Sequence, residues 1–227
     1  MFGKGKESSA DRGEEAPVLD WRDVSEFSFG RELRRVGKKR RKPVGGPYAV
    51  RVPTGDPQDP LLLPCAFFAP DVQGISASRL YEDAAAQHVL VSYDPREASG
   101  EEGVWRYRVR DGAGEEIGAI RRIPPANRMV KHTWRIDQPG RPEIVGRNKL
   151  ARTRPGAAKW AVGRMIGEAL ASATAGDESD SARKPRTLEW TADGEAVMTS
   201  QYLGTYVLSA DWLDRRLAFA YALLRDQ

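Results

Sequence analysis

The sequence predicts a mainly β fold, a closed antiparallel β-barrel of about twelve strands around a buried C-terminal helix, with one extra inserted helix. Two observations support this prediction. From residue 48 onward, short extended runs alternate with turn residues, and the chain ends in a helix without a polar face. A sheet of so many strands must curl. The inside of a closed sheet can bury a helix that is apolar on every side.

The terminal helix is predicted within residues 209–227. Asp211 is expected to cap its first turn, and Asp214 adds negative charge at the positive end of the helix dipole. The run from Leu217 to Leu224 carries no charge. At ~1.5 Å per residue this run spans about 12 Å, whereas a bilayer core requires about 30 Å. We therefore expect the helix to fill a protein core and not to anchor the chain in a membrane.

Turn residues divide the rest of the barrel region into strands. The clearest hairpin joins residues 104–110 to 117–123 through the turn Asp111–Gly114. A second hairpin, 131–137 with 143–149, turns at residues 138–140. Further strands are predicted at 48–52, 61–68, 75–81, 87–93, 186–191, 196–202 and 205–209. One alanine-rich segment, residues 156–173, interrupts the β pattern and predicts the inserted helix.

Two regions are predicted in the chain. Residues 1–46 form a disordered, basic N-terminal arm with a short docking segment at 18–29, where apolar residues lie among acids. Residues 47–227 form the barrel domain, with a helical insertion at 151–186. On this division, deleting residues 1–46 is expected to leave the thermal midpoint almost unchanged.

Positive charge is concentrated in two stretches. The chain has a formal net charge of +4, and residues 1–46 account for it with 12 basic and 8 acidic side chains. Residues 104–154 hold 13 basic and 5 acidic side chains. Such a distribution can produce a face with a positive field.

Two groups of basic residues are candidate anion sites. On the barrel, alternate residues of one strand share a face with residues of its hairpin partner, and arginine's forked donors suit phosphate. The predicted ligand-binding residues are Arg106, Arg108, Arg110, Arg121 and Arg122. The predicted arm residues are Arg34, Arg35, Lys38, Lys39, Arg40, Arg41 and Lys42. The alternatives are that acidic neighbours such as Glu115 and Glu116 neutralise the barrel face, and that the arm is a solvated linker.

Catalysis finds little support in the sequence. The two histidines, His88 and His132, lie outside metal-type and nucleophile-type motifs. Cys65 stands alone in an apolar run, which indicates a buried thiol and a reducing, cytoplasmic setting. The glycines of the turn at 112–114 lie between two strands, whereas a phosphate loop joins a strand to a helix. We expect no enzyme activity, cofactor or metal.

Two segments resemble a known family. Residues 107–121, Tyr-Arg-Val-Arg-Asp-Gly-Ala-Gly-Glu-Glu-Ile-Gly-Ala-Ile-Arg, are similar to the strand, Asp-x-x-Gly turn and Ile-Gly strand of the tubby-like superfamily, which includes phospholipid scramblases and LURP-one-related proteins. Residues 206–226 resemble its last strand and C-terminal helix. The resemblance covers roughly residues 48–227 and implies twelve strands wrapped around the helix.

The resemblance implies binding to membrane lipids, and three functions follow as hypotheses. The first is a module, cytoplasmic or peripheral at the membrane, that binds an anionic phospholipid surface or anionic ligand through the barrel face and the arm. The others are a nucleic-acid-binding accessory protein and a protein-interaction scaffold without ligand. The chain lacks the cysteine-rich stretch of animal scramblases, and Asp211 and Asp214 do not form a calcium-type loop.

Overall fold

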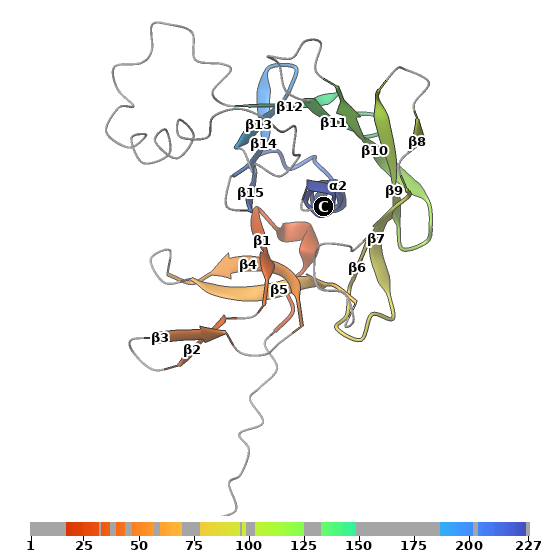
Figure 1. Cartoon of the computed structure of the whole chain (residues 1–227). Coiled ribbons are helices and arrows are strands. Elements are labelled where there is room, and N and C mark those ends of the chain that lie inside the picture. Colours follow the sequence, from red (N-terminus) through yellow and green to blue (C-terminus); the bar gives the residue numbers. More distant parts are fainter. Residues whose placement is uncertain are drawn as a thin grey trace, which may run out of the picture.

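The computed structural model describes residues 17–31, 33–36, 40–43, 47–56, 60–69, 78–95, 97–98, 103–124, 133–148, 187–201 and 204–225. Within these residues, twelve antiparallel strands close into a barrel, and the helix α2 (Arg215–Arg225) lies inside it (Figure 1). The predicted barrel around a C-terminal helix is confirmed. The predicted inserted helix at 156–173, and the insertion at 151–186 that contains it, lie outside the described residues.

The main sheet follows a ring. Its strands are β1 (Glu26–Gly30), β4 (Ala49–Thr54), β5 (Leu61–Phe67), β6 (Arg79–Tyr81), β7 (Val89–Tyr93), β8 (Glu97–Ala98), β9 (Trp105–Asp111), β10 (Glu116–Ile123), β11 (Thr133–Asp137), β12 (Ile144–Asn148), β13 (Leu188–Ala192), β14 (Glu195–Ser200) and β15 (Thr205–Leu208). The spatial order is β10-β11-β12-β13-β14-β15-β1-β4-β5-β6-β7-β9, and pairing of β9 with β10 closes the ring. The short strand β8 adds to β9.

A strand from the predicted arm belongs to the barrel. The segment at 18–29 forms a short 3-10 helix, η1 (Trp21–Asp23), and then β1. β1 pairs with β15 on one side and with β4 on the other, and Phe27 is fully buried. The barrel therefore takes in residues before the boundary predicted at residue 47.

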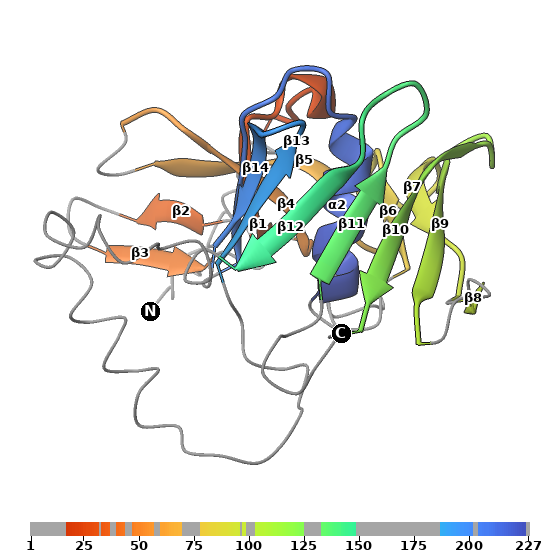
Figure 2. The ribbon, with the colours of Figure 1, turned by 90° about the horizontal axis from the view of Figure 1, so that it is seen from above.

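The antiparallel order gives the barrel two different ends. α2 follows β15, so the helix begins at the end where β15 stops; we call this the helix-start end. η1 and the turns that follow β9, β11 and β13 lie at the same end (Figure 2). At the opposite, helix-stop end, α2 finishes, β10 and β12 finish, and the chain leaves β1 for the segment that leads to β4.

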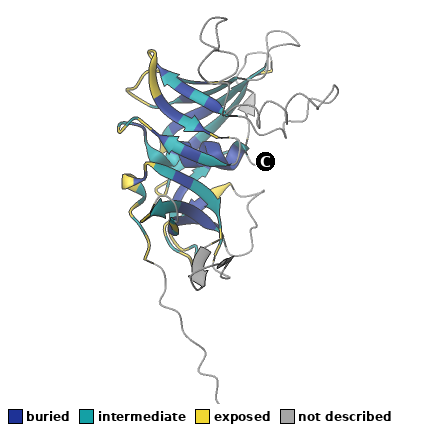
Figure 3. Cartoon of the chain, turned by 90° about the vertical axis from the view of Figure 1, so that its left-hand side faces the viewer, coloured by how far each residue is buried: buried dark blue, intermediate teal, exposed yellow. Residues whose placement is uncertain are grey.

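The core lies between the helix and the inner face of the barrel. Every residue from Leu217 to Leu224 is buried (Figure 3). The ring of Phe219 meets that of Phe27 edge-on at 4.8 Å between centroids, and Tyr221 meets Trp190 at 4.5 Å. The helix thus fills the barrel as its uncharged sequence predicts.

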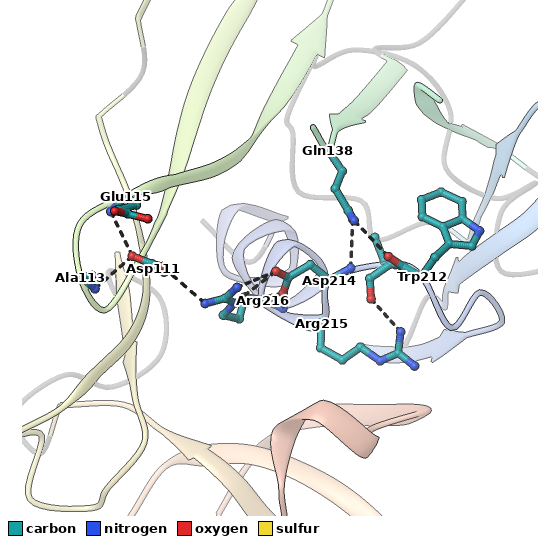
Figure 4. Close-up of polar contacts among 9 residues, drawn as sticks. Asp111, Ala113, Glu115, Gln138, Trp212, Asp214, Arg215 and Arg216 are labelled. Atoms are coloured by element: carbon teal, nitrogen blue, oxygen red, sulfur yellow. Dashed lines mark hydrogen bonds and ion pairs between the residues drawn. The ribbon is translucent and has the colours of Figure 1, made fainter. Parts of the chain in front are cut away.

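A polar network holds the start of the helix (Figure 4). The Asp214 carboxylate accepts a hydrogen bond from the Arg216 amide at 2.9 Å, and the Asp214 amide donates to the Gln138 side chain at 3.0 Å. The Arg215 guanidinium donates to the carbonyl of Val24 at 3.0 Å. The predicted cap is therefore corrected. The helix begins at Arg215 and Asp214 supplies the cap, whereas Asp211 is exposed in the preceding turn.

Candidate anion-binding surfaces

Three of the predicted arginines share the outer face of β9. Val109 is fully buried and Tyr107 packs against the core, so Arg106, Arg108 and Arg110, which alternate with these two residues, point outward. In the register with β10, Arg106 lies opposite Arg121, whereas Arg110 lies opposite Glu116. The structure therefore brings Arg121 into the same surface as Arg106, Arg108 and Arg110.

Acidic side chains pair with the arginines of β9. The Arg106 guanidinium donates to the Glu116 carboxylate at 2.9 Å, and that of Arg110 donates to Asp94 at 3.0 Å. These pairs are partly exposed, so each adds little stability, yet each offsets the local positive charge. The alternative of neutralisation, which the sequence left open, thus applies to Arg106 through Glu116. The other acid that the sequence suggested, Glu115, is exposed in the turn between β9 and β10.

A denser network surrounds Arg121. Its guanidinium makes two hydrogen bonds to Asp137, at 2.6 and 2.8 Å, and a third to Glu143 at 2.6 Å. The bond to Asp137 raises the pKa of Arg121. Burial raises the pKa of Glu143, but hydrogen bonds from Arg135 and Arg121 outweigh that effect and lower it. Arg121 and Glu143 therefore stay charged, and the Nε and Nη2 donors of Arg121 are occupied.

Arg122 does not join this surface. It follows Arg121 in an alternating strand, so it points to the other side of the sheet, where Trp134 is its register partner in β11. Its guanidinium lies 5.9 Å from the centre of the Trp134 ring, within reach of a cation–π contact. Trp134 in turn packs against Tyr221 of the helix. Arg122 therefore covers the helix-stop end of the core.

The arm contains a basic hairpin. β2 (Leu33–Val36) and β3 (Arg40–Pro43) pair as a separate two-stranded sheet. The register sets Arg34 opposite Lys42 and Arg35 opposite Arg41. Lys38 and Lys39 lie outside the described residues. Like charges directly opposite one another destabilise a hairpin, and neither strand contains an acidic residue.

The cysteine and the described histidine do not lie in surroundings that favour catalysis. Cys65 is buried, and burial raises the pKa of its thiol to about 12, against the opposing effect of Arg51. The thiol is therefore protonated at neutral pH and unsuited to nucleophilic attack. The His88 ring lies 3.2 Å from the Asp83 carboxylate in an exposed turn. His132 lies outside the described residues.

A pocket of about 360 Å³ lies on the outer surface of β12 and β13. It is lined by Glu143, Val145, Arg147, Glu189, Thr191, Asp193 and Gly194. None of the predicted site residues is among them. With three acids against one arginine, the lining does not suit an anion.

The described part of the chain holds no group of three or more His, Cys, Asp or Glu residues placed to bind a metal ion. None of its helices is long and apolar enough to cross a bilayer.

The sequence did not identify the residues that neutralise the barrel face. Asp94, Asp137 and Glu143 come from three strands or turns, and the pairing of β7 with β9 and of β10 with β11 brings them to the arginines. Acids next to the turn of the predicted hairpin were the one available signal. They pointed to Glu115 and Glu116, and of these two Glu116 pairs with Arg106.

The fold and these surfaces define a class, a closed antiparallel barrel filled by its own C-terminal helix, with a basic hairpin attached. The chain matches no family model, no curated protein and no solved structure.

Proposed function

We propose that this protein is a non-enzymatic, tubby-like or scramblase-like module that binds an anionic phospholipid surface through its basic arm. The observation that carries the proposal is the register of β2 and β3, which places Arg34 opposite Lys42 and Arg35 opposite Arg41. An anionic surface relieves the repulsion within such pairs, and each basic residue near an anionic membrane contributes about 1 kcal/mol.

The barrel supports the same proposal in a different way. A closed barrel filled by a helix is the architecture that the resemblance to the tubby-like superfamily implies. The interior is packed with side chains, as the burial of α2 and its aromatic neighbours shows, so a ligand is expected on the outside. Because Arg106, Arg110 and Arg121 of the barrel face are paired with acids, we assign the main attraction to the hairpin.

Nucleic acid is the less favoured partner. Proteins that bind single strands combine basic grooves with aromatic rings on which bases stack. Near the arginine face, Tyr107 packs against the core and Trp134 lies between Arg122 and Tyr221. These rings are already engaged within the protein.

The test replaces Arg34, Arg35, Arg41 and Lys42 by Gln in the full chain and measures pelleting with vesicles of phosphatidylcholine and phosphatidylserine. At about 1 kcal/mol per residue, affinity should fall by on the order of 10² to 10³-fold. The control variant Arg106→Gln/Arg108→Gln should change it much less, because Glu116 already offsets Arg106. Thermal midpoints verify that both variants fold.

A gel shift with DNA over a salt series distinguishes the alternatives. Loss of vesicle binding alone supports lipid recognition, and equal loss for vesicles and DNA indicates unspecific charge attraction. Vesicle pelleting that the hairpin variant leaves unchanged would overturn the proposal and favour an interaction scaffold.

A further inference from the structure

Charge is divided along the barrel axis. Seven segments meet at the helix-start end: the one before β1, the turns that follow β4, β6, β9, β11 and β13, and the one between β15 and α2. Their described residues hold ten acids and two arginines, Arg22 and Arg141, and two further arginines, Arg215 and Arg216, begin α2 at this end. Six of the acids lie in three segments: Asp20, Asp23, Glu82, Asp83, Asp211 and Asp214.

The helix-stop end has the opposite composition. Arg31 follows β1 there, Arg79 begins β6, Arg147 lies near the end of β12, and Arg225 ends α2. The hairpin β2–β3, with five basic residues, leaves the barrel at this end because β1 stops at Gly30 and β4 begins at Ala49. The described residues of the connecting segments there hold one acid, Asp94, which is paired with Arg110. One further acid, Glu189 near the start of β13, lies opposite Arg147 in the register.

Ion pairs reduce this division but do not remove it. At the helix-start end, Glu143 pairs with Arg121 and Arg135, and Asp214 pairs with Arg216. Arg31, Arg79 and Arg147 are exposed, and in the part of the chain that the structure describes no salt bridge reaches them. Positive charge thus remains at the helix-stop end.

The two ends are far enough apart to act separately. The eight-residue strand β10 runs from the helix-start end to the helix-stop end, and at about 3.3 Å per residue it extends over about 26 Å. The screening length at physiological salt is about 8 Å. A surface that touches the helix-stop end is therefore screened from the acids at the other end.

We infer that the barrel docks end-on: its helix-stop end faces the anionic phospholipid surface and its helix-start end points away. This inference rests on the proposed function and adds the orientation. The basic residues come from β6, β12, α2 and the hairpin, and such a ring of charge suits a flat surface better than a narrow strand. In the reversed orientation, the acids of the helix-start end would be repelled.

Site-specific labelling tests the orientation. In a Cys65→Ala background, single-cysteine variants Gln201→Cys at the helix-stop end and Ala113→Cys at the helix-start end each carry a fluorophore; both native residues are exposed and uncharged. The probe is a phosphatidylserine-containing vesicle with a nitroxide-headgroup lipid as quencher. We expect several-fold stronger quenching at position 201 than at 113.

The outcomes separate the two proposals. Bound protein with equal quenching at both positions, or with stronger quenching at 113, overturns the orientation and leaves membrane binding in place. Labelled protein that fails to bind vesicles, while its thermal midpoint is unchanged, overturns both. Neutral phosphatidylcholine vesicles should give no quenching at either position.

Matched arginine variants give an independent measurement. Arg79→Gln removes an exposed charge from the helix-stop end, and Arg141→Gln removes one from the helix-start end. We expect about fivefold weaker vesicle binding for Arg79→Gln, which corresponds to ~1 kcal/mol per basic residue, and unchanged binding for Arg141→Gln. Equal effects of the two substitutions would contradict end-on docking.

Discussion

Gly146 shows how closely single residues are fitted inside the barrel. It lies on the inner face of β12, opposite Trp190 of β13 in the register. A Cβ at Gly146 would lie 2.9 Å from three carbon atoms of the Trp190 ring. That ring is fully buried, and its indole nitrogen donates to the Ser200 hydroxyl at 3.2 Å. The indole therefore has little room to move away from an added methyl group.

We predict that Gly146→Ala destabilises the protein, whereas Gly30→Ala does not. Overpacking a buried site costs typically 1 to 3 kcal/mol. At Gly30, which also lies in a strand, a Cβ would meet nothing within 4 Å. Urea unfolding followed by circular dichroism measures both variants. Equal stabilities for Gly146→Ala and the unmodified chain would show that the Trp190 ring can shift at low cost.

At the scale of elements, the place of β1 in the barrel changes the contribution to stability that is expected from the N-terminal region. The strand stands between β15 and β4, so its removal opens the ring and exposes the pairing edges of both neighbours. It also removes Phe27, which contacts Phe219 and Tyr206. The sequence alone suggested that residues 1–46 could be deleted at almost no cost in stability, and the structure reverses that expectation.

We therefore predict that deleting residues 1–46 abolishes cooperative folding. Replacing residues 33–43 by a Gly-Ser linker removes the same hairpin but keeps β1 and should leave the thermal midpoint nearly unchanged. Differential scanning calorimetry compares the two chains. A cooperative transition at the normal midpoint for the 1–46 deletion would mean that β1 is dispensable for closure.

At the scale of the whole molecule, closure of the ring by β9 and β10 surrounds α2 with strands. The helix is eleven residues long, a length that is marginal for an isolated helix in water. Its stability therefore comes from the barrel, and the helix in turn supplies eight buried residues, Leu217 to Leu224, to the barrel's core. Neither part can open far without the other.

We expect the amides of residues 218–223 to be among the slowest in the protein to exchange with deuterium, at rates set by global unfolding. β8, which pairs with β9 at only two positions, should exchange much faster. Hydrogen exchange by nuclear magnetic resonance, with and without sub-denaturing urea, measures both. Protection of α2 below that of the barrel strands would indicate that the helix leaves the barrel in a partial opening.

The fold could be predicted because its signals are local. Alternation in β9, the turn at 111–114 and the uncharged run from Leu217 to Leu224 each occupy a few consecutive residues. Apolar burial on every side of the helix then requires an enclosure, and many short strands supply one. These local sequence patterns were therefore enough to predict a barrel around the helix.

Only the tertiary structure decided which arginines are neutralised by acids and which keep an uncompensated positive charge. Whether Arg121 is available depends on Asp137 and Glu143, which lie 16 and 22 residues away in the chain. Alternation places Arg121 and Arg122 on opposite sides of β10, and only the positions of the core and Trp134 show which is outside. The membership of β1 in the barrel likewise depends on pairing with β15, the strand that precedes α2. Such pairings are set by the closure of the whole sheet, which short-range sequence patterns do not encode.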